Sequence, residues 1–239
     1  IMAIASSTWH RVLKMKSVYF LILCVIILIA SAYNYNILSL DCHRALMIDV
    51  SMLLNTIAAI IIALSISFEI PKELREGVAS TLLSKPLGRT QYLIGKMVGV
   101  IVSGLVITGL ITLGFVFVFN TAFKDLTEAM VQAHLLIMGS VIPMCAIATL
   151  ISVIIPENLS PLITAICLWF SFSISKLSNI KIIYGGILPD LNLFNIRAEA
   201  CYSASIDWLY VGLVVLWGIV FSVFATSVSS LVFGYKDLK

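Results

Sequence analysis

Long apolar runs dominate the chain, and short polar segments separate them. Two of the longest, Leu46–Ile70 and Trp208–Phe233, lack the alternation of apolar and polar residues that a membrane barrel strand shows. A membrane-crossing helix instead needs about 20 consecutive, mostly apolar residues. Because backbone groups in lipid must be paired internally, the choice lies between helices and a closed barrel. The pattern predicts helices.

Six membrane spans are predicted, and they form one transmembrane domain over residues 1–239. Ahead of them, residues 1–17 combine apolar and basic side chains at helical spacing, which predicts an amphipathic helix lying on the membrane surface. The longest hydrophilic connections are 69–96, between spans two and three, and 178–207, before the last span. The predicted fold is an all-α membrane protein. Its spans lie at about 18–32, 46–68, 97–119, 134–155, 162–177 and 208–233.

Composition agrees with a chain embedded in lipid. It is 61% hydrophobic and only 11% charged, against about 25% charged residues in an average soluble domain. Such a chain cannot cover a water-facing surface, so membrane lipids are its expected surroundings. The net charge is +3, and no basic block suits a nucleic-acid backbone, which excludes that class of partner.

The basic residues set the predicted orientation. Six spans place ten of the 15 lysines and arginines on the side of the N-terminus, and cytoplasmic loops carry the excess of such residues. Both termini are therefore predicted to be cytoplasmic, in an inner or plasma membrane. The ten residues are Arg11, Lys14, Lys16, Lys72, Arg75, Lys85, Arg89, Lys96, Lys236 and Lys239.

Few residues in the spans suggest chemistry. The middles of the spans contain no Asp, Glu, Lys or Arg, which argues against a proton-coupled pump. No phosphate-binding loop, His/Cys cluster or nucleophile–base set is recognisable, so no catalytic residue, metal or bound cofactor is predicted. Ser51, Asn55 and Ser171 are candidates for a substrate path. Packing between helices is the favoured role for such side chains, and Asn55 should face protein or a cavity.

Two of the five cysteines, Cys42 and Cys201, lie in connections predicted on the same outer side. They are a candidate disulfide in an oxidising compartment. Two unpaired thiols are at least as plausible, since a sequence does not give the Cα separation that a bridge requires.

The segment 69–96 holds eight of the 27 charged residues (15 basic plus 12 acidic). Pro71 is expected in the first turn of a helix, which places Glu69 and Glu73 near a helix N-terminus that favours acids. One apolar stripe and an opposite charged side follow over about 72–84. A mid-helix Gly77 suggests that another backbone approaches closely. The alternative is a solvated loop anchored by basic residues. The stripe is Leu74, Val78 and Leu82.

These residues resemble the cytoplasmic loop of permease subunits of type-2 ATP-binding-cassette exporters. That family has an acid, E-G, then LL-x-x-P-x-x-R, and a G-K entering the third span. Leu188–Asn195 is similar to the family's P-N-x-x-x-F segment before the last span, with Asp190 in place of the commoner Asn. The six spans, the N-terminal helix and the length agree too. The first motif is Glu73, Glu76-Gly77, Leu82-Leu83, Pro86, Arg89, Tyr92 and Gly95-Lys96.

The resemblance implies a permease that forms a translocation path with a second copy or a paralogue. A separate ATPase subunit would bind ATP and Mg²⁺, and this chain would not be an enzyme. A coupling helix at about 72–84 would dock into the ATPase, so Glu73→Lys or Glu76→Lys should weaken coupling while the spans stay folded. The implied contacts are Glu73, Leu74, Glu76, Gly77, Val78, Leu82, Leu83, Pro86 and Arg89.

Two other functions stay open from the residues alone. One is a non-transporting structural or assembly subunit of a larger membrane complex, and a more distant one is an enzyme that acts on lipids. For a permease, the residues are compatible with several substrates: small apolar drugs, lipids, peptides, or a sulfur or metal-cluster precursor.

Overall fold

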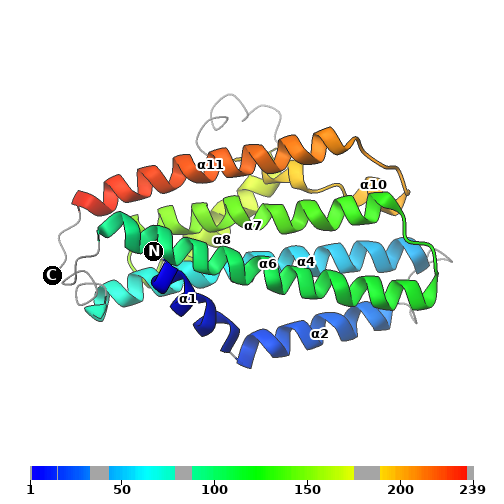
Figure 1. The fold of residues 1–239 in the computed structure, drawn as a ribbon, viewed down its shortest axis with the longest axis horizontal. Coiled ribbons are helices and arrows are strands. Elements are labelled where there is room, and N and C mark those ends of the chain that lie inside the picture. Colours follow the sequence, from blue (N-terminus) through cyan, green and yellow to red (C-terminus); the bar gives the residue numbers. More distant parts are fainter. Residues whose placement is uncertain (1, 15, 33–42, 79–87, 175–188, 236–239) are drawn as a thin grey trace.

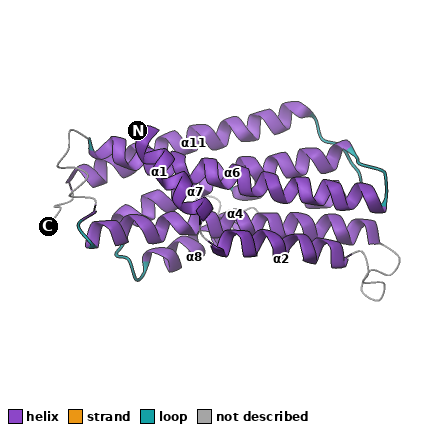
Figure 2. Ribbon diagram, turned by 60° about the horizontal axis from the view of Figure 1, so that its bottom comes forward, coloured by secondary structure: helices purple, strands orange, loops and turns teal. Residues whose placement is uncertain are grey.

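The computed structural model describes residues 2–14, 16–32, 43–78, 88–174 and 189–235. Every regular element in these ranges is a helix (Figures 1 and 2), so the predicted all-α class is confirmed. In chain order the elements are α1 (Met2–Lys14), α2 (Lys16–Ala32), α4 (His43–Arg75), α6 (Arg89–Ala122), α7 (Glu128–Ile154), α8 (Ser160–Ser173), the 3₁₀ turn η2 (Leu191–Phe194), α10 (Arg197–Cys201) and α11 (Trp208–Tyr235).

The long helices lie side by side along one axis, with α1 crossing obliquely at one end (Figure 1). Helix α7 is the centre of the bundle: it packs most extensively against α4 and α11, and 72% of its most apolar window is buried. On α11 that fraction is 33%, which leaves apolar side chains such as Leu213 and Phe224 exposed. Apolar surface turned outward on this scale fits a lipid environment.

Four of the described helices, α4, α6, α7 and α11, are long and apolar enough to cross a membrane. The bent pair of α1 and Tyr19–Ser31, with 56° between its parts, makes a fifth if it is counted as one span. Helix α8 has 14 described residues, about 21 Å at 1.5 Å per residue, which is shorter than a bilayer core. A multi-pass membrane protein is therefore supported, and the full set of six spans stays a prediction.

Three pairings bring distant segments to one end of the bundle. Arg11 Nη2 of α1 lies 2.7 Å from Glu73 Oε1 of α4. Arg75 Nη1 lies 2.8 Å from Glu157 Oε2, in the turn between α7 and α8. Arg89 Nη1 donates to the carbonyl oxygen of Gly234 in α11 at 2.8 Å. We call this end, where α4 and α11 finish and α6 begins, the charged end.

Helix α4 corrects the expected layout of the charged segment. Pro71 lies inside α4 and does not begin a new helix, so Glu69 and Glu73 occupy its last turns and not a helix N-terminus. Gly77 follows the end of α4 with φ of 72°, a conformation that costs glycine nothing. Gly77 thus takes the conformation that commonly ends a helix, and the expected close approach of another backbone stays a prediction. The part of the expected coupling helix beyond Val78 lies outside the described residues.

Helix α1 confirms the predicted N-terminal helix and shows where its buried side goes. Ala5, Thr8 and Val12 are buried, and α1 packs mainly against α6. The contact is close at Gly99, where an added Cβ would lie 2.7 Å from both the Ala5 carbonyl oxygen and Thr8 Cβ. The buried stripe of α1 therefore faces protein, not lipid, because a small residue on α6 lets the two backbones approach.

Candidate functional site

A group of charged and polar side chains is buried at the charged end, between three helices. Arg11 comes from α1, Glu69 and Glu73 from α4, and Tyr92 and Lys96 from α6. The two acids are four residues apart, and so are Tyr92 and Lys96. Each pair therefore shares one face of its helix. We call these five residues the ion cluster.

Glu73 is the centre of the ion cluster. Its Oε1 lies 2.5 Å from Lys96 Nζ and 2.7 Å from Arg11 Nη2. Its Oε2 accepts a 2.5 Å hydrogen bond from the Tyr92 hydroxyl. Both oxygens are thus used inside the chain, which corrects the expectation that Glu73 lies on an exposed charged side of a helix.

Glu69 completes the charge balance. Its Oε2 accepts a hydrogen bond from Lys96 Nζ at 3.3 Å. Its Oε1 lies 3.1 Å from Arg11 Nε, an ion pair without hydrogen-bond alignment. Two carboxylates face one lysine and one arginine, so the cluster is formally neutral. A buried ionic group is tolerable when its partners are complete and costly when one is removed.

Burial divides the cluster into an inner part and an outer part. Tyr92, Lys96, Glu73 and Glu69 are 0%, 3%, 6% and 8% exposed. The side chain of Arg11 is 44% exposed. Arg11 therefore covers the cluster from the solvent side. The position of α1 on the bundle therefore depends in part on the two acids at the end of α4.

Tyr92→Phe tests the inner part of the cluster. The substitution removes one hydrogen bond to a carboxylate but keeps the ring that stacks on Phe233 at 6.1 Å. Because Glu73 retains both cations, we expect the free energy of unfolding to fall by about 1.5 kcal/mol, a typical value for a hydrogen bond to a charged group. Denaturant titration in detergent measures it, and an unchanged midpoint would contradict the assignment.

Apart from Glu73 in the ion cluster and Gly77 in the turn after α4, the residues expected at the ATPase contact fall into three groups. Glu76 and Val78 are exposed, Leu74 is partly buried, and all three lie at the charged end. Arg89 caps the end of α11 through the carbonyls of Phe233 and Gly234. Three other predicted residues lie outside the described residues: Leu82, Leu83 and Pro86.

The expected substrate-path residues are buried but do not form one site. Asn55 Nδ2 donates to Thr112 Oγ1 at 3.1 Å, so this side chain faces protein as predicted. Ser51 Oγ donates to the carbonyl oxygen of Ile48 and lies 3.5 Å from His134 Nε2. Ser171 is on α8, and no hydrogen bond among the described residues joins its hydroxyl to the others. His134 was not predicted there, since nothing in the sequence places it beside Ser51.

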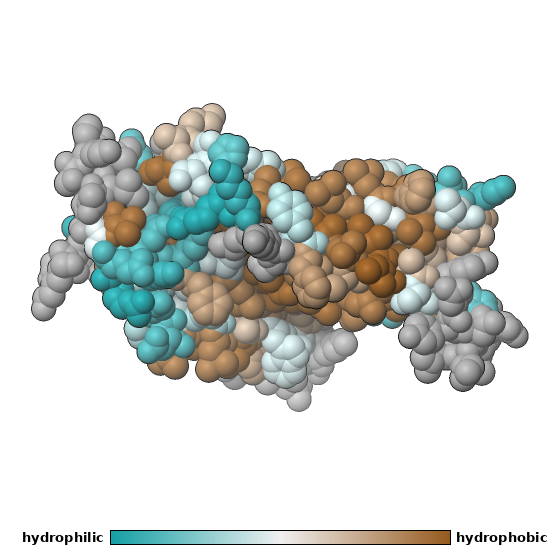
Figure 3. Space-filling model, turned by 90° about the horizontal axis from the view of Figure 1, so that it is seen from below, coloured by the Kyte–Doolittle hydropathy of each residue, from teal (hydrophilic) through white to brown (hydrophobic). Residues whose placement is uncertain are grey.

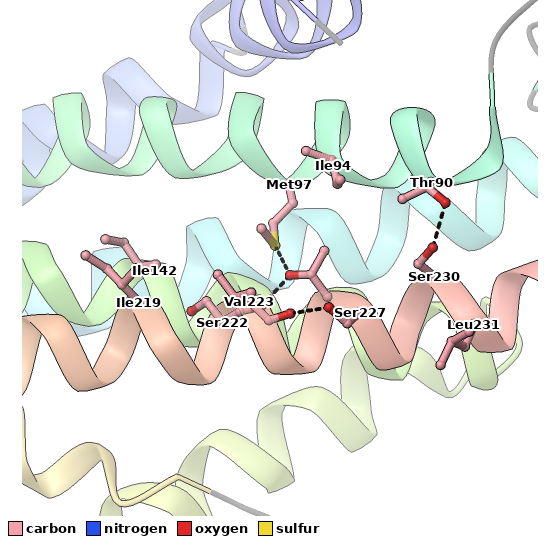
Figure 4. Close-up of a pocket in the computed structure, with 11 residues that line it drawn as sticks. Thr90, Ile94, Met97, Ile142, Ile219, Ser222, Val223, Ser227, Ser230 and Leu231 are labelled. Carbon is pink, nitrogen blue, oxygen red and sulfur yellow. Dashed lines mark hydrogen bonds between the residues drawn. The ribbon is translucent and has the colours of Figure 1, made fainter.

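An apolar groove of about 560 Å³ lies between α6, α7 and α11, beside the charged end (Figure 4). Its hydroxyl groups are already used: Thr90 and Ser230 bond to each other at 2.7 Å, and Thr226 donates to Met97 Sδ at 3.3 Å. Ser227 donates to the Val223 carbonyl oxygen. The groove therefore presents a mainly apolar wall, whose hydroxyl groups bond within the protein.

The segment similar to P-N-x-x-x-F forms a packed corner. Asp190 Oδ1 accepts from the Asn192 backbone N–H at 3.0 Å and so begins η2. The buried Phe194 enters between α7 and α11: a Cβ added to Gly218 would lie 3.0 Å from its ring, and one added to Gly139 would lie 3.6 Å away. The described part of this segment therefore fixes α11 against α7.

No family model matches the chain, and no curated protein matches it. The likeness to type-2 exporter permeases thus depends on the motifs themselves. Of these, Glu73, Tyr92 and Lys96 meet in the ion cluster, and Glu76-Gly77 marks the turn after α4. No group of three or more His, Cys, Asp or Glu side chains in the described ranges is arranged to hold a metal ion.

The candidate disulfide is not tested, because Cys42 lies outside the described residues. Cys201 lies at the opposite end of the bundle from the ion cluster, with its Sγ 3.5 Å from the Ala45 carbonyl oxygen. The bridge stays a prediction.

Proposed function

We propose that this chain is the transmembrane permease subunit of an ATP-driven exporter, which works as a dimer with separate ATPase subunits. The observation that carries the proposal is the ion cluster. It joins the N-terminal helix, the end of α4 and the start of α6 at the point where the chain continues into the segment that resembles an ATPase-coupling loop.

The cluster suggests how movement would be transmitted. A push on the turn at Glu76-Gly77 acts on the last turn of α4, and Glu73 carries it to Lys96 on α6 and to Arg11 on α1. Three helices would then move together, since separating them leaves charges unpaired in a buried place. Such a group behaves as a rigid body with few alternative arrangements, as gating elements require. The chain supplies no chemistry for ATP hydrolysis in this account.

A structural or assembly subunit is the second candidate. The same ion cluster would then only fasten α1 to the bundle, and the surface at Glu76 would contact a partner that does not hydrolyse ATP.

Glu76→Lys tests the proposed coupling surface. Glu76 has a 45% exposed side chain whose closest ion partner is Lys72 at 4.0 Å, so its reversal leaves the buried cluster intact. Glu73→Lys is no longer a suitable test, because it would place three cations around Glu69. We expect Glu76→Lys to weaken association with the ATPase about tenfold through unfavourable charge at the interface. ATP hydrolysis by the reconstituted complex, titrated with ATPase, measures this.

Glu199→Lys is the matched control. It makes the same change on an exposed residue of α10, at the opposite end of the bundle. The ATPase should bind this variant as it binds the unmodified chain. Equal loss of association in both variants would point to a general charge effect, and loss in neither would argue against coupling at the charged end.

A further inference from the structure

Helix α1 has a basic face of which the proposed transport function uses only Arg11. Ser7, His10, Arg11 and Lys14 recur at helical spacing, are all exposed, and line a shallow hollow of about 630 Å³. The opposite face of α1, with Ala5 and Val12, is buried. The exposed stripe is therefore held in one orientation by the packing of α1 on α6.

The charge of this face is unbalanced along its own helix. The sequence Met2–Lys14 contains no acidic residue. The two acids nearest to Arg11, Glu69 and Glu73, are turned inward and shared with Lys96. Arg11 is only partly used by them: its side chain is 44% exposed, so part of its fork of donors faces outward.

The position of α1 beside the hydrophobic belt of the bundle indicates the kind of ligand. Figure 3 shows hydrophilic residues gathered at the end where α1 lies, directly beside a broad belt of hydrophobic residues. Helix α1 precedes α2, a 17-residue run with a strongly apolar sequence. A basic face at the edge of an apolar belt lies at headgroup depth, where anionic lipids concentrate near Lys and Arg.

We propose that Ser7, His10, Arg11 and Lys14 form a binding site for the phosphate-bearing headgroup of an anionic phospholipid. Lys14 supplies a positive charge that no acid on α1 balances, Arg11, His10 and Ser7 supply hydrogen bonds, and the acyl chains remain in the adjoining apolar belt. Because Arg11 also covers the ion cluster, lipid composition would change how firmly α1 packs against the bundle. This inference depends on the membrane setting and not on transport.

Lys14→Gln tests the site, since Lys14 lies outside the ion cluster. The probe is phosphatidylglycerol, added to the 239-residue chain in detergent and counted as bound lipid by native mass spectrometry. Phosphatidylcholine and inorganic phosphate are tested in separate arms. We expect the variant to bind phosphatidylglycerol roughly fivefold more weakly, as one basic residue near an anionic headgroup contributes. The control Lys124→Asn removes one charge at the other end, where φ of 54° suits Asn, and should bind normally.

Three results would overturn the proposal. One is equal binding of phosphatidylglycerol by Lys14→Gln and the unmodified chain. The second is phosphatidylcholine binding as tightly as phosphatidylglycerol, which would mean that the anionic headgroup is not recognised. The third is inorganic phosphate binding as tightly as the lipid, which would assign the site to a free anion.

Discussion

Replacement of Lys96 by Met should lower the free energy of unfolding by about 3–5 kcal/mol, the range observed when a buried ion pair loses one partner. Lys96 is 3% exposed and contacts both Glu73 and Glu69. Without it, two carboxylates share Arg11 alone, and the cluster carries one uncompensated negative charge. Denaturant unfolding in detergent, followed by circular dichroism, gives the value.

Two variants separate a charge effect from a packing effect. Adding Glu69→Gln to Lys96→Met restores a neutral cluster, with Glu73 facing Arg11, so part of the lost stability should return. Arg197→Met breaks the Arg197–Asp49 pair at the other end, whose side chains are 28% and 46% exposed, and should cost no more than about 1 kcal/mol. If Lys96→Met and Arg197→Met cost the same, the ion cluster is not a buried network.

Gly99→Ala should loosen α1 from the bundle. The new methyl group would lie 2.7 Å from the Ala5 carbonyl oxygen, a backbone atom that cannot rotate away. Overpacking of this kind costs up to about 3 kcal/mol. If that cost falls on the docking of α1, its detached state becomes roughly a hundredfold more populated. Maleimide labelling of a cysteine at buried Val12, with the native cysteines replaced by alanine, measures the exposure.

Gly212→Ala is the control for this substitution. Gly212 lies within α11, and an added Cβ there meets no atom within 4 Å. Alanine also favours a helix over glycine by about 1 kcal/mol, so the fold should be unharmed and the labelling of Val12→Cys unchanged. Slow labelling in Gly99→Ala as well would mean that α1 is not held by this contact.

The pattern of apolar runs was sufficient to predict the helical class and the approximate course of most helices. Continuous apolar stretches leave no alternative in lipid, which is why α6 and α11 lie where they were expected. The end of α4 was predicted wrongly at Pro71, because proline is over-represented in the first turn of helices. Here the helix continues through it, as membrane helices often do.

Only part of the ion cluster could be predicted from the sequence. The spacing of four between Glu69 and Glu73, and between Tyr92 and Lys96, next to apolar runs, could have indicated two facing pairs. The contribution of Arg11 could not be foreseen, since 62 residues separate it from Glu73 and only the packing of α1 brings it there. Charges that look solvated in a sequence can be buried when a distant helix supplies the opposite sign.

The proposed exporter function requires that the charged end of this bundle contact an ATPase. The most direct measurement is purification of the chain from its own membranes in a gentle detergent, with a photo-crosslinking amino acid at Glu76 and identification of the linked protein by mass spectrometry. We expect an ATPase to copurify in equal amount to the chain and to be crosslinked at Glu76 and not at Glu199. A complex that contains no ATPase, or an ATPase linked only at Glu199, would contradict it.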